Sequence, residues 1–178
     1  IELVPVAEHG HSHGAEHLDP HIWLDPRRMA IIATTVAEAV RSLEPSIARA
    51  IDHNLRTLHL TLEDADRRAA ALLGPLEGRD LLVFHPAYGY LTRRYGLHQV
   101  AVEDEGKAPS ARRLATIMRS AGDRGVSAIF VQPQFSTFAA QRVADALGCE
   151  VVELDPLAED WPENFVMMAT RIAAALGD

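Results

Sequence analysis

Four short apolar segments, each followed by a helical pattern, are the feature that most constrains the fold of this 178-residue chain. The expected strands are residues 81–84, 99–102, 128–131 and 151–154. The expected helices are residues 88–95, a segment that begins at about 110, residues 137–147 and residues 163–176. Strands that alternate with helices every 20–25 residues or so are typical of a parallel sheet covered on both faces. We therefore expect an α/β fold with a four-stranded parallel sheet flanked by helices.

Two long helical patterns precede these strands. Asp25 is a good N-cap and Pro26 suits the first helical position, and apolar residues then recur at helical spacing. Glu44-Pro45 interrupts the pattern and Gly74-Pro75 ends it, so each helix spans on the order of 30 Å and suits a brace across one face or between two lobes. The chain thus divides into a His-rich loop or linker (1–18), a metal-ligand segment with long connecting helices (19–74) and a carboxyl-terminal α/β lobe (75–178).

The composition excludes several classes of protein. Seventeen basic against 25 acidic residues give a net charge of −8, which argues against binding to a nucleic-acid backbone. No run of 18 apolar residues occurs, so we expect no transmembrane segment. Cys149 has no partner for an internal disulfide or a cysteine-cluster metal site. The chain begins without Met or a leader pattern, which indicates a processed, trimmed or partial sequence.

Polar residues follow each expected strand at the edge where ligands bind in a parallel sheet. His85 follows the first strand, Glu103 the second, Gln132 the third and Asp155 the fourth. An imidazole and a carboxylate at one edge are suitable zinc ligands, and His21, between two prolines before the long helix, is a candidate for the third. From the residues alone, structural explanations are the more common ones: a hydrogen-bonded structural residue for each histidine, a turn former for Asp155 and part of a solvated loop for Glu103.

Four segments in order carry a resemblance to a known family. They are Asp19-Pro-His-Ile-Trp-Leu-Asp-Pro26, Phe84-His-Pro-Ala-Tyr-Gly-Tyr90, Gln132-Pro-Gln-Phe135 and Leu154-Asp-Pro-Leu157. Together they resemble the zinc- and manganese-binding proteins of bacterial metal ABC importers, the zinc-uptake type in particular. The resemblance covers about residues 15–178. It corresponds to the end of the interlobe loop, the connecting helix and the carboxyl-terminal lobe, without the amino-terminal lobe.

The resemblance implies a receptor in which two lobes joined by a rigid helix hold the ion in their cleft. The matching positions imply His21, His85 and Asp155 as ligands, with Tyr88, Glu103 and Gln132 supporting these ligands or lining the cleft. Imidazole at His85 favours Zn²⁺, with Mn²⁺ as the alternative, because relatives that bind manganese tend to carry a carboxylate there. The implied function is a non-enzymatic binding protein, periplasmic or lipid-anchored at the outer face of the cytoplasmic membrane, that delivers zinc to importer membrane subunits.

Some features leave alternatives open. One such feature is the histidine tract, which comprises His9, His11, His13 and His17. It resembles the histidine-rich loop of zinc-type members, which implies low-affinity zinc capture. The competing interpretation is a leftover flexible tail. Three ligands with an open position also fit a zinc hydrolase with Glu103 or Glu105 as general base. Because relatives in the resembled family also include surface adhesins, a metal-binding surface adhesin is a further alternative. Long helices without the second lobe would expose apolar surface, which predicts dimerisation or aggregation.

Overall fold

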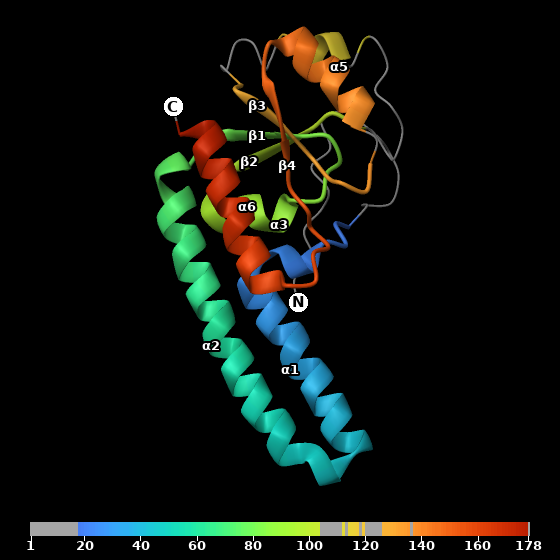
Figure 1. Cartoon of the computed structure of the whole chain (residues 1–178), viewed down its shortest axis with the longest axis vertical. Helices are drawn as coiled ribbons and strands as arrows, with labels where there is room; N and C mark the ends of the chain where they lie inside the picture. Colours follow the sequence, from blue (N-terminus) through green and yellow to red (C-terminus); the bar gives the residue numbers. More distant parts are fainter. Residues whose placement is uncertain are drawn as a thin grey trace.

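The four expected strands form one parallel sheet in the computed structural model, which describes residues 18–103, 112, 114–117, 119, 126–135 and 137–177. The strands are β1 (Asp80–Val83), β2 (His98–Ala101), β3 (Ala128–Val131) and β4 (Glu150–Glu153). Their order is β2-β1-β3-β4, and every neighbouring pair is parallel (Figure 1). The predicted α/β class and the four-stranded parallel sheet are confirmed.

Three of the strands begin one residue earlier than the apolar pattern predicted. The ladder pairs Asp80 with His98 and Ala128 with Glu150, so it takes in polar residues that an apolar run does not include. The residues just after these strands still belong to the hydrogen-bonded edge, because the N–H of Leu154 donates to Val131 at 2.8 Å. The error is therefore one of boundary and not of pairing.

Side chains alternate between two cores on opposite faces of the sheet. In β1, Leu81 and Val83 belong to one core, whereas Leu82 and the following Phe84 belong to the other, as the two-residue period of a strand requires. The first core is covered by α2 (Ala48–Leu73), α3 (Gly89–Tyr95) and α6 (Trp161–Leu176), and the second by α5 (Thr137–Leu147) (Figure 1). Ile117, in the expected helix after residue 110, also packs in the second core. The predicted cover on both faces is thus present.

The two long helices form an antiparallel hairpin. Helix α1 (Pro26–Leu43) and helix α2 (Ala48–Leu73) are joined by a 3-10 turn at Pro45–Ile47, and a second such turn at Gly74–Leu76 follows α2. These breaks fall where the proline-containing pairs predicted them. The end of α2 nearest the sheet packs against α6, whereas the free end of the hairpin projects away from the lobe (Figure 1).

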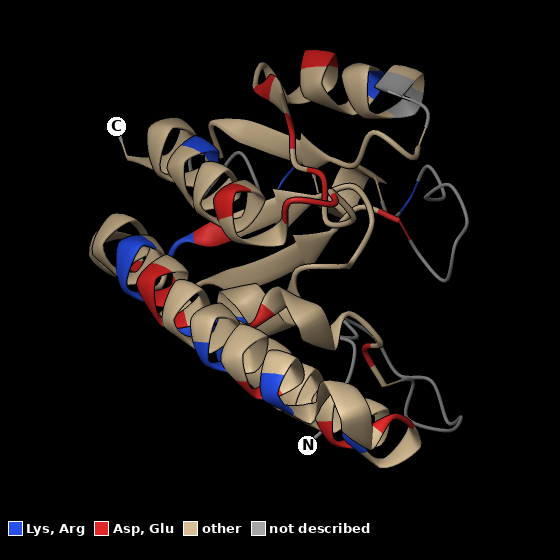
Figure 2. Ribbon diagram, turned by 60° about the horizontal axis from the view of Figure 1, so that its bottom comes forward, with Lys and Arg blue, Asp and Glu red and all other residues tan. Residues whose placement is uncertain are grey.

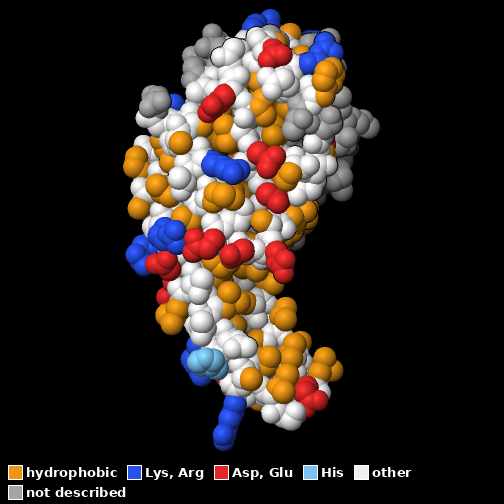
Figure 3. All heavy atoms as spheres, viewed as in Figure 1, with side chains coloured by type: hydrophobic (Ala, Val, Ile, Leu, Met, Phe, Trp, Pro, Cys, Tyr) orange, Lys and Arg blue, Asp and Glu red, His pale blue; other side chains and the backbone are white. Residues whose placement is uncertain are grey.

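The free part of the hairpin exposes apolar side chains, visible in Figure 3; its largest exposed hydrophobic residues are Ile31, Val36, Leu43, Ile47 and Leu60. Acidic and basic residues are intermixed along the same two helices (Figure 2), and Arg41 of α1 pairs with Asp52 of α2 at 2.7 Å. Among the described residues, no helix combines the length and the hydropathy needed to cross a bilayer.

Candidate metal site

His21 is held in place by Asp19, two residues before it. The carboxylate oxygen Oδ1 of Asp19 lies 2.9 Å from the backbone nitrogen of His21 and 2.7 Å from its Nδ1. Asp19 is only 1% exposed, and the hydroxyl of Tyr90 donates to its carbonyl at 3.2 Å. A proton on Nδ1 satisfies this contact and leaves the lone pair of the ring on Nε2, the nitrogen available for a metal.

His85 is held in the same way by a residue from the next strand exit. Its Nδ1 lies 3.0 Å from Oε2 of Glu103, which is 5% exposed and whose N–H donates to the Phe84 carbonyl at 2.9 Å. The ring of Phe135 stacks on the imidazole, with 4.9 Å between the centroids. The His21 and His85 rings are neighbours, with centroids 5.6 Å apart and planes at 82°. Both histidines therefore have Nδ1 tied to a buried carboxylate.

Asp155 follows β4 and lies beside residues from two other strand exits. Its Oδ1 accepts hydrogen bonds from Nε2 of Gln134 at 2.7 Å and from the N–H of Leu157 at 3.0 Å. Burial raises the pKa of the Tyr88 hydroxyl, and the negative charge of Asp155 raises it further. That hydroxyl donates to the carbonyl of Leu154 at 2.8 Å. Asp155 and Tyr88 are thus close enough to interact electrostatically.

The predicted site residues are brought together only in part. His21 and His85 lie side by side, and Glu103 contacts His85, but Oδ1 of Asp155 is engaged by Gln134. Across the described part of the chain, no group of three or more His, Cys, Asp or Glu side chains is arranged to hold a metal ion. Asp155 as the third ligand therefore stays a prediction. The tract of four histidines and Glu105 lie outside the described residues.

Gln132 is buried at the end of β3, between the exits of β1 and β4 in the sheet order. It is 2% exposed, and its Oε1 has no hydrogen-bond partner within the described residues. A buried acceptor without a partner is uncommon in a native structure. Its place at this edge is consistent with the predicted location along the cleft, while its role stays a prediction.

Sequence reasoning did not assign a role to Asp19, Trp23 or Phe135. Asp19 carries a local signal, because an Asp two residues before a backbone N–H commonly accepts its hydrogen bond. Trp23 has no such signal, since its indole N–H donates to the carbonyl of Pro156, 133 positions away. The stacking of Phe135 on His85 likewise joins two strand exits and depends on the folded sheet.

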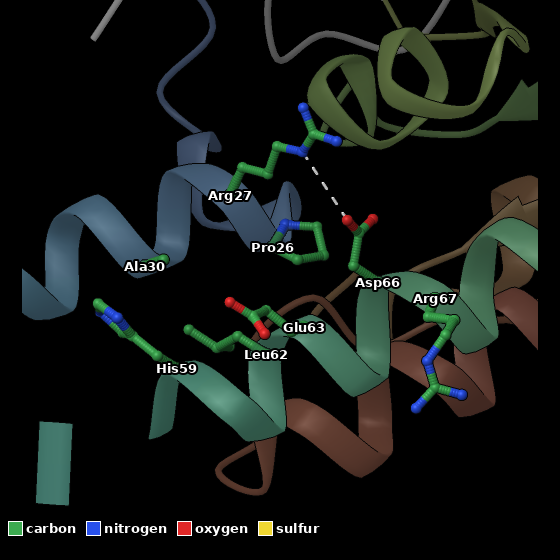
Figure 4. Close-up of a pocket in the computed structure, with 8 residues that line it drawn as sticks. All are labelled: Pro26, Arg27, Ala30, His59, Leu62, Glu63, Asp66 and Arg67. Atoms are coloured by element: carbon green, nitrogen blue, oxygen red, sulfur yellow. Dashed lines mark ion pairs between the residues drawn. The ribbon is translucent and has the colours of Figure 1, made fainter. Parts of the chain in front are cut away.

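A separate cavity of about 410 Å³ lies between α1 and α2, and neither His21 nor His85 lines it. Figure 4 shows its lining, in which Arg27 and Asp66 form an ion pair with 3.8 Å between Nε and Oδ2. His59 and Glu63 extend from α2 into the same region (Figure 4). None of the predicted metal ligands lines this cavity, so it is not the candidate metal site.

Comparison with known proteins identifies a family. Residues 1–177 match the family model described as zinc-uptake complex component A, periplasmic (ZnuA). The high-affinity zinc uptake system protein ZnuA of Brucella abortus is 31% identical over 166 residues, which cover 90% of this chain and 49% of the relative. The zinc-binding protein AdcA of Streptococcus pyogenes is 28% identical over 153 residues, which cover 85% of this chain and 29% of that protein.

Solved structures agree with the sequence match. A crystal structure of ZnuA superposes with a TM-score of 0.85 at 37% identity and covers 89% of this chain and 62% of the other. A zinc-bound deletion mutant of ZnuA gives a TM-score of 0.86 at 34% identity, with 98% and 66% covered. The chain spans about half the length of the curated ZnuA relatives it matches. On these matches, the chain belongs to the ZnuA family of periplasmic zinc-uptake complex components.

Proposed function

We propose that this chain is the metal-holding part of a periplasmic zinc receptor that delivers Zn²⁺ to the membrane subunits of an ABC importer. His21 and His85 bind the ion through their Nε2 atoms, and Asp155 completes the ligands that this chain supplies. The observation that carries the proposal is the pair of adjacent imidazoles, each with Nδ1 against a buried carboxylate. Membership in the ZnuA family supports it independently.

The carboxylate–imidazole pairs match what zinc requires of histidine ligands. A hydrogen bond from Nδ1–H to a carboxylate fixes the tautomer and the ring orientation and makes Nε2 a better donor. Asp19 and Glu103 provide this on the two rings. Within the described residues, hydrogen bonds to the Asp155 carboxylate involve Oδ1, so we assign Oδ2 to the metal. Zinc accepts such mixed nitrogen and oxygen ligands at about 2.0–2.2 Å.

The two imidazoles are also the reason that we propose zinc and not manganese as the metal. Two imidazoles suit zinc, whereas manganese prefers carboxylate, carbonyl and water oxygens. The histidine tract 9–17 is proposed as a second, weaker zinc-capture segment, with His9, His11, His13 and His17 as its ligands.

A zinc hydrolase is less well supported than a receptor. As the general base of a hydrolase, Glu103 would have to accept a proton from a metal-bound water. Its Oε2, however, lies 3.0 Å from Nδ1 of His85 and is already engaged there. The family match also favours a binding component over an enzyme. Laminin-binding proteins of streptococci share the fold at 22% identity, which gives the adhesin alternative no support beyond the fold.

Chelator competition tests the proposal. We expect the chain to take up one Zn²⁺ in preference to Mn²⁺, and His21→Ala or His85→Ala to weaken this binding by at least roughly a hundredfold. His98→Ala is the matched control, because His98 is exposed at the start of β2, at the opposite edge of the sheet. Zinc affinity that is equal in wild type, His21→Ala and His85→Ala would refute the proposal.

A further inference from the structure

We infer that Trp23, Tyr88 and Asn164 are positioning residues that together fix the Asp155 segment for metal binding, and that Trp23 ties it to the segment carrying His21. This inference rests on the proposed function and deepens it. The resemblance assigns no role to Trp23 or Asn164, and neither residue belongs to the ligand set. What joins the three is that each donates a side-chain hydrogen bond to the same short stretch of backbone after β4.

Three consecutive carbonyls of this stretch each accept one of these donors. The Tyr88 hydroxyl donates to the Leu154 carbonyl at 2.8 Å and Nδ2 of Asn164 to the Asp155 carbonyl at 2.7 Å. The indole Nε1–H of Trp23 donates to the Pro156 carbonyl at 2.9 Å. The donors come from the start of α3, the first turn of α6 and the 3-10 turn at Ile22–Leu24. The backbone on both sides of the Asp155 side chain is therefore held from three directions.

Trp23 connects this stretch with the first proposed ligand. Its ring lies edge-on to His21, with 5.4 Å between the centroids. Its own carbonyl accepts a hydrogen bond from Nε1 of Trp161 at 3.1 Å, and Trp161 stacks on the fully buried Phe165 at 4.8 Å. The two tryptophans thus tie the His21 segment both to the stretch after β4 and to the beginning of α6. Movement of either ligand segment would break hydrogen bonds on the other.

Asn164 shows that the arrangement is not optimised for stability alone. The residue is 7% exposed, and its Oδ1 has no hydrogen-bond partner within the described residues. Leaving a buried acceptor unpaired costs stability, and an apolar side chain would avoid that cost. The amide supplies one thing that an apolar residue cannot, which is the bond from Nδ2 to the Asp155 carbonyl. We take this bond as the reason for the amide.

Fixing the backbone leaves the Asp155 carboxylate with only its side-chain rotations to settle when zinc binds. Ordering a free backbone residue costs conformational entropy, and a preorganised site avoids that cost at the moment of binding. Release of the Asp155 segment should therefore weaken zinc binding even though no ligand atom is removed.

Zinc affinity and thermal stability, measured side by side on the 178-residue chain, test the inference. We expect Trp23→Phe, which keeps a ring but loses the indole N–H, to weaken zinc binding roughly tenfold. Losses of this size are typical when a residue that supports a metal ligand is replaced. Asn164→Leu should weaken it similarly while its melting temperature stays within about 3 °C of wild type. Tyr95→Phe is the control, because it also removes one hydrogen-bond donor from an aromatic residue, the hydroxyl that donates to Asp66, and it should leave zinc affinity unchanged.

A double-mutant cycle separates positioning from general loosening. If Trp23 acts through Asp155, the combined Trp23→Phe and Asp155→Asn protein should lose less affinity than the two single changes predict together. His85→Ala, assayed in parallel, reports on the proposed function itself. Loss of binding in His85→Ala with wild-type affinity in both Trp23→Phe and Asn164→Leu overturns this inference alone. Unchanged binding in His85→Ala overturns the zinc site. Should Trp23→Phe fail to fold, Asn164→Leu decides the question.

Discussion

Replacing Gly89 by alanine should disrupt the support of His21 without touching a ligand. Gly89 is the first residue of α3, and a Cβ placed there would lie 2.5 Å from Oδ2 of Asp19. Ordinary contact begins at 3.4 Å, so the carboxylate would have to recede by about 0.9 Å. Asp19 is 1% exposed and is already bonded to two nitrogens of His21, so it has little room to adapt.

The size of the effect follows from these contacts. A shift of that size takes the distances of 2.9 and 2.7 Å between Asp19 and His21 to the limit of a hydrogen bond or beyond it. Losing a hydrogen bond to a charged group costs about 1.5–3 kcal/mol, which the higher helix propensity of alanine offsets by roughly 0.5–1 kcal/mol. We therefore expect a net destabilisation of about 1–2 kcal/mol and a loss of zinc affinity of roughly 10–100-fold.

Chelator competition and thermal melting measure the two effects of Gly89→Ala, and Gly74→Ala provides the control. Gly74 has φ −54° at the end of α2 and no atom within 4 Å of an added Cβ, so alanine there should stabilise by about 0.4–1 kcal/mol and leave zinc binding alone. Asp19→Ala should reproduce the loss of affinity, and adding Gly89→Ala to it should cost little more. A folded Gly89→Ala protein with wild-type zinc affinity would refute the reasoning.

Two further predictions concern the hairpin. Burial raises the pKa of Asp66, but hydrogen bonds from Arg94 and Tyr95 outweigh it and hold the pKa below its usual value. Its stabilising effect is therefore present above about pH 4 and lost as the pH falls through the lowered pKa, so Asp66→Asn should make urea midpoints less sensitive to acid. The combined Leu43→Glu and Leu60→Glu protein should self-associate less in sedimentation velocity, because these side chains are 85% and 68% exposed. A wild-type chain that stays monomeric at high concentration would contradict the second prediction.

The fold was predictable because its signals are local. The short apolar run at β1, the proline-containing breaks at Glu44-Pro45 and Gly74-Pro75, and the helical stripes can each be recognised in short windows. Strand boundaries were less accurate, since a ladder extends to any residue with a partner, polar or not. Asp80 and Glu150 enter their strands because His98 and Ala128 lie opposite them. That pairing depends on residues 18 or more positions away.

The site was predictable only as far as topology determines it. The rule that parallel strands end at one edge predicted that His85, Glu103 and Asp155 would line the same edge of the sheet, and Nδ1 of His85 lies 3.0 Å from Oε2 of Glu103. It could not predict which oxygen of Asp155 is engaged, nor that Gln134 would engage it. Those details depend on side-chain rotamers and on contacts between strand exits. The support of Asp155 by Trp23 is the extreme case, because its hydrogen bond crosses most of the chain.

The same contrast separates the two kinds of histidine in this chain. His21 and His85 are oriented by carboxylates that belong to the folded lobe, so the cost of ordering them is borne when the lobe folds and not when zinc binds. The tract from His9 to His17 separates its histidines by glycine, serine, alanine and glutamate, a composition without large apolar residues. Each of its residues that becomes fixed around a metal costs roughly 1–2 kcal/mol at that moment. We therefore expect the tract to capture zinc more weakly than the proposed site at the paired histidines, which is the order of affinities that would let an ion pass from the tract to that site.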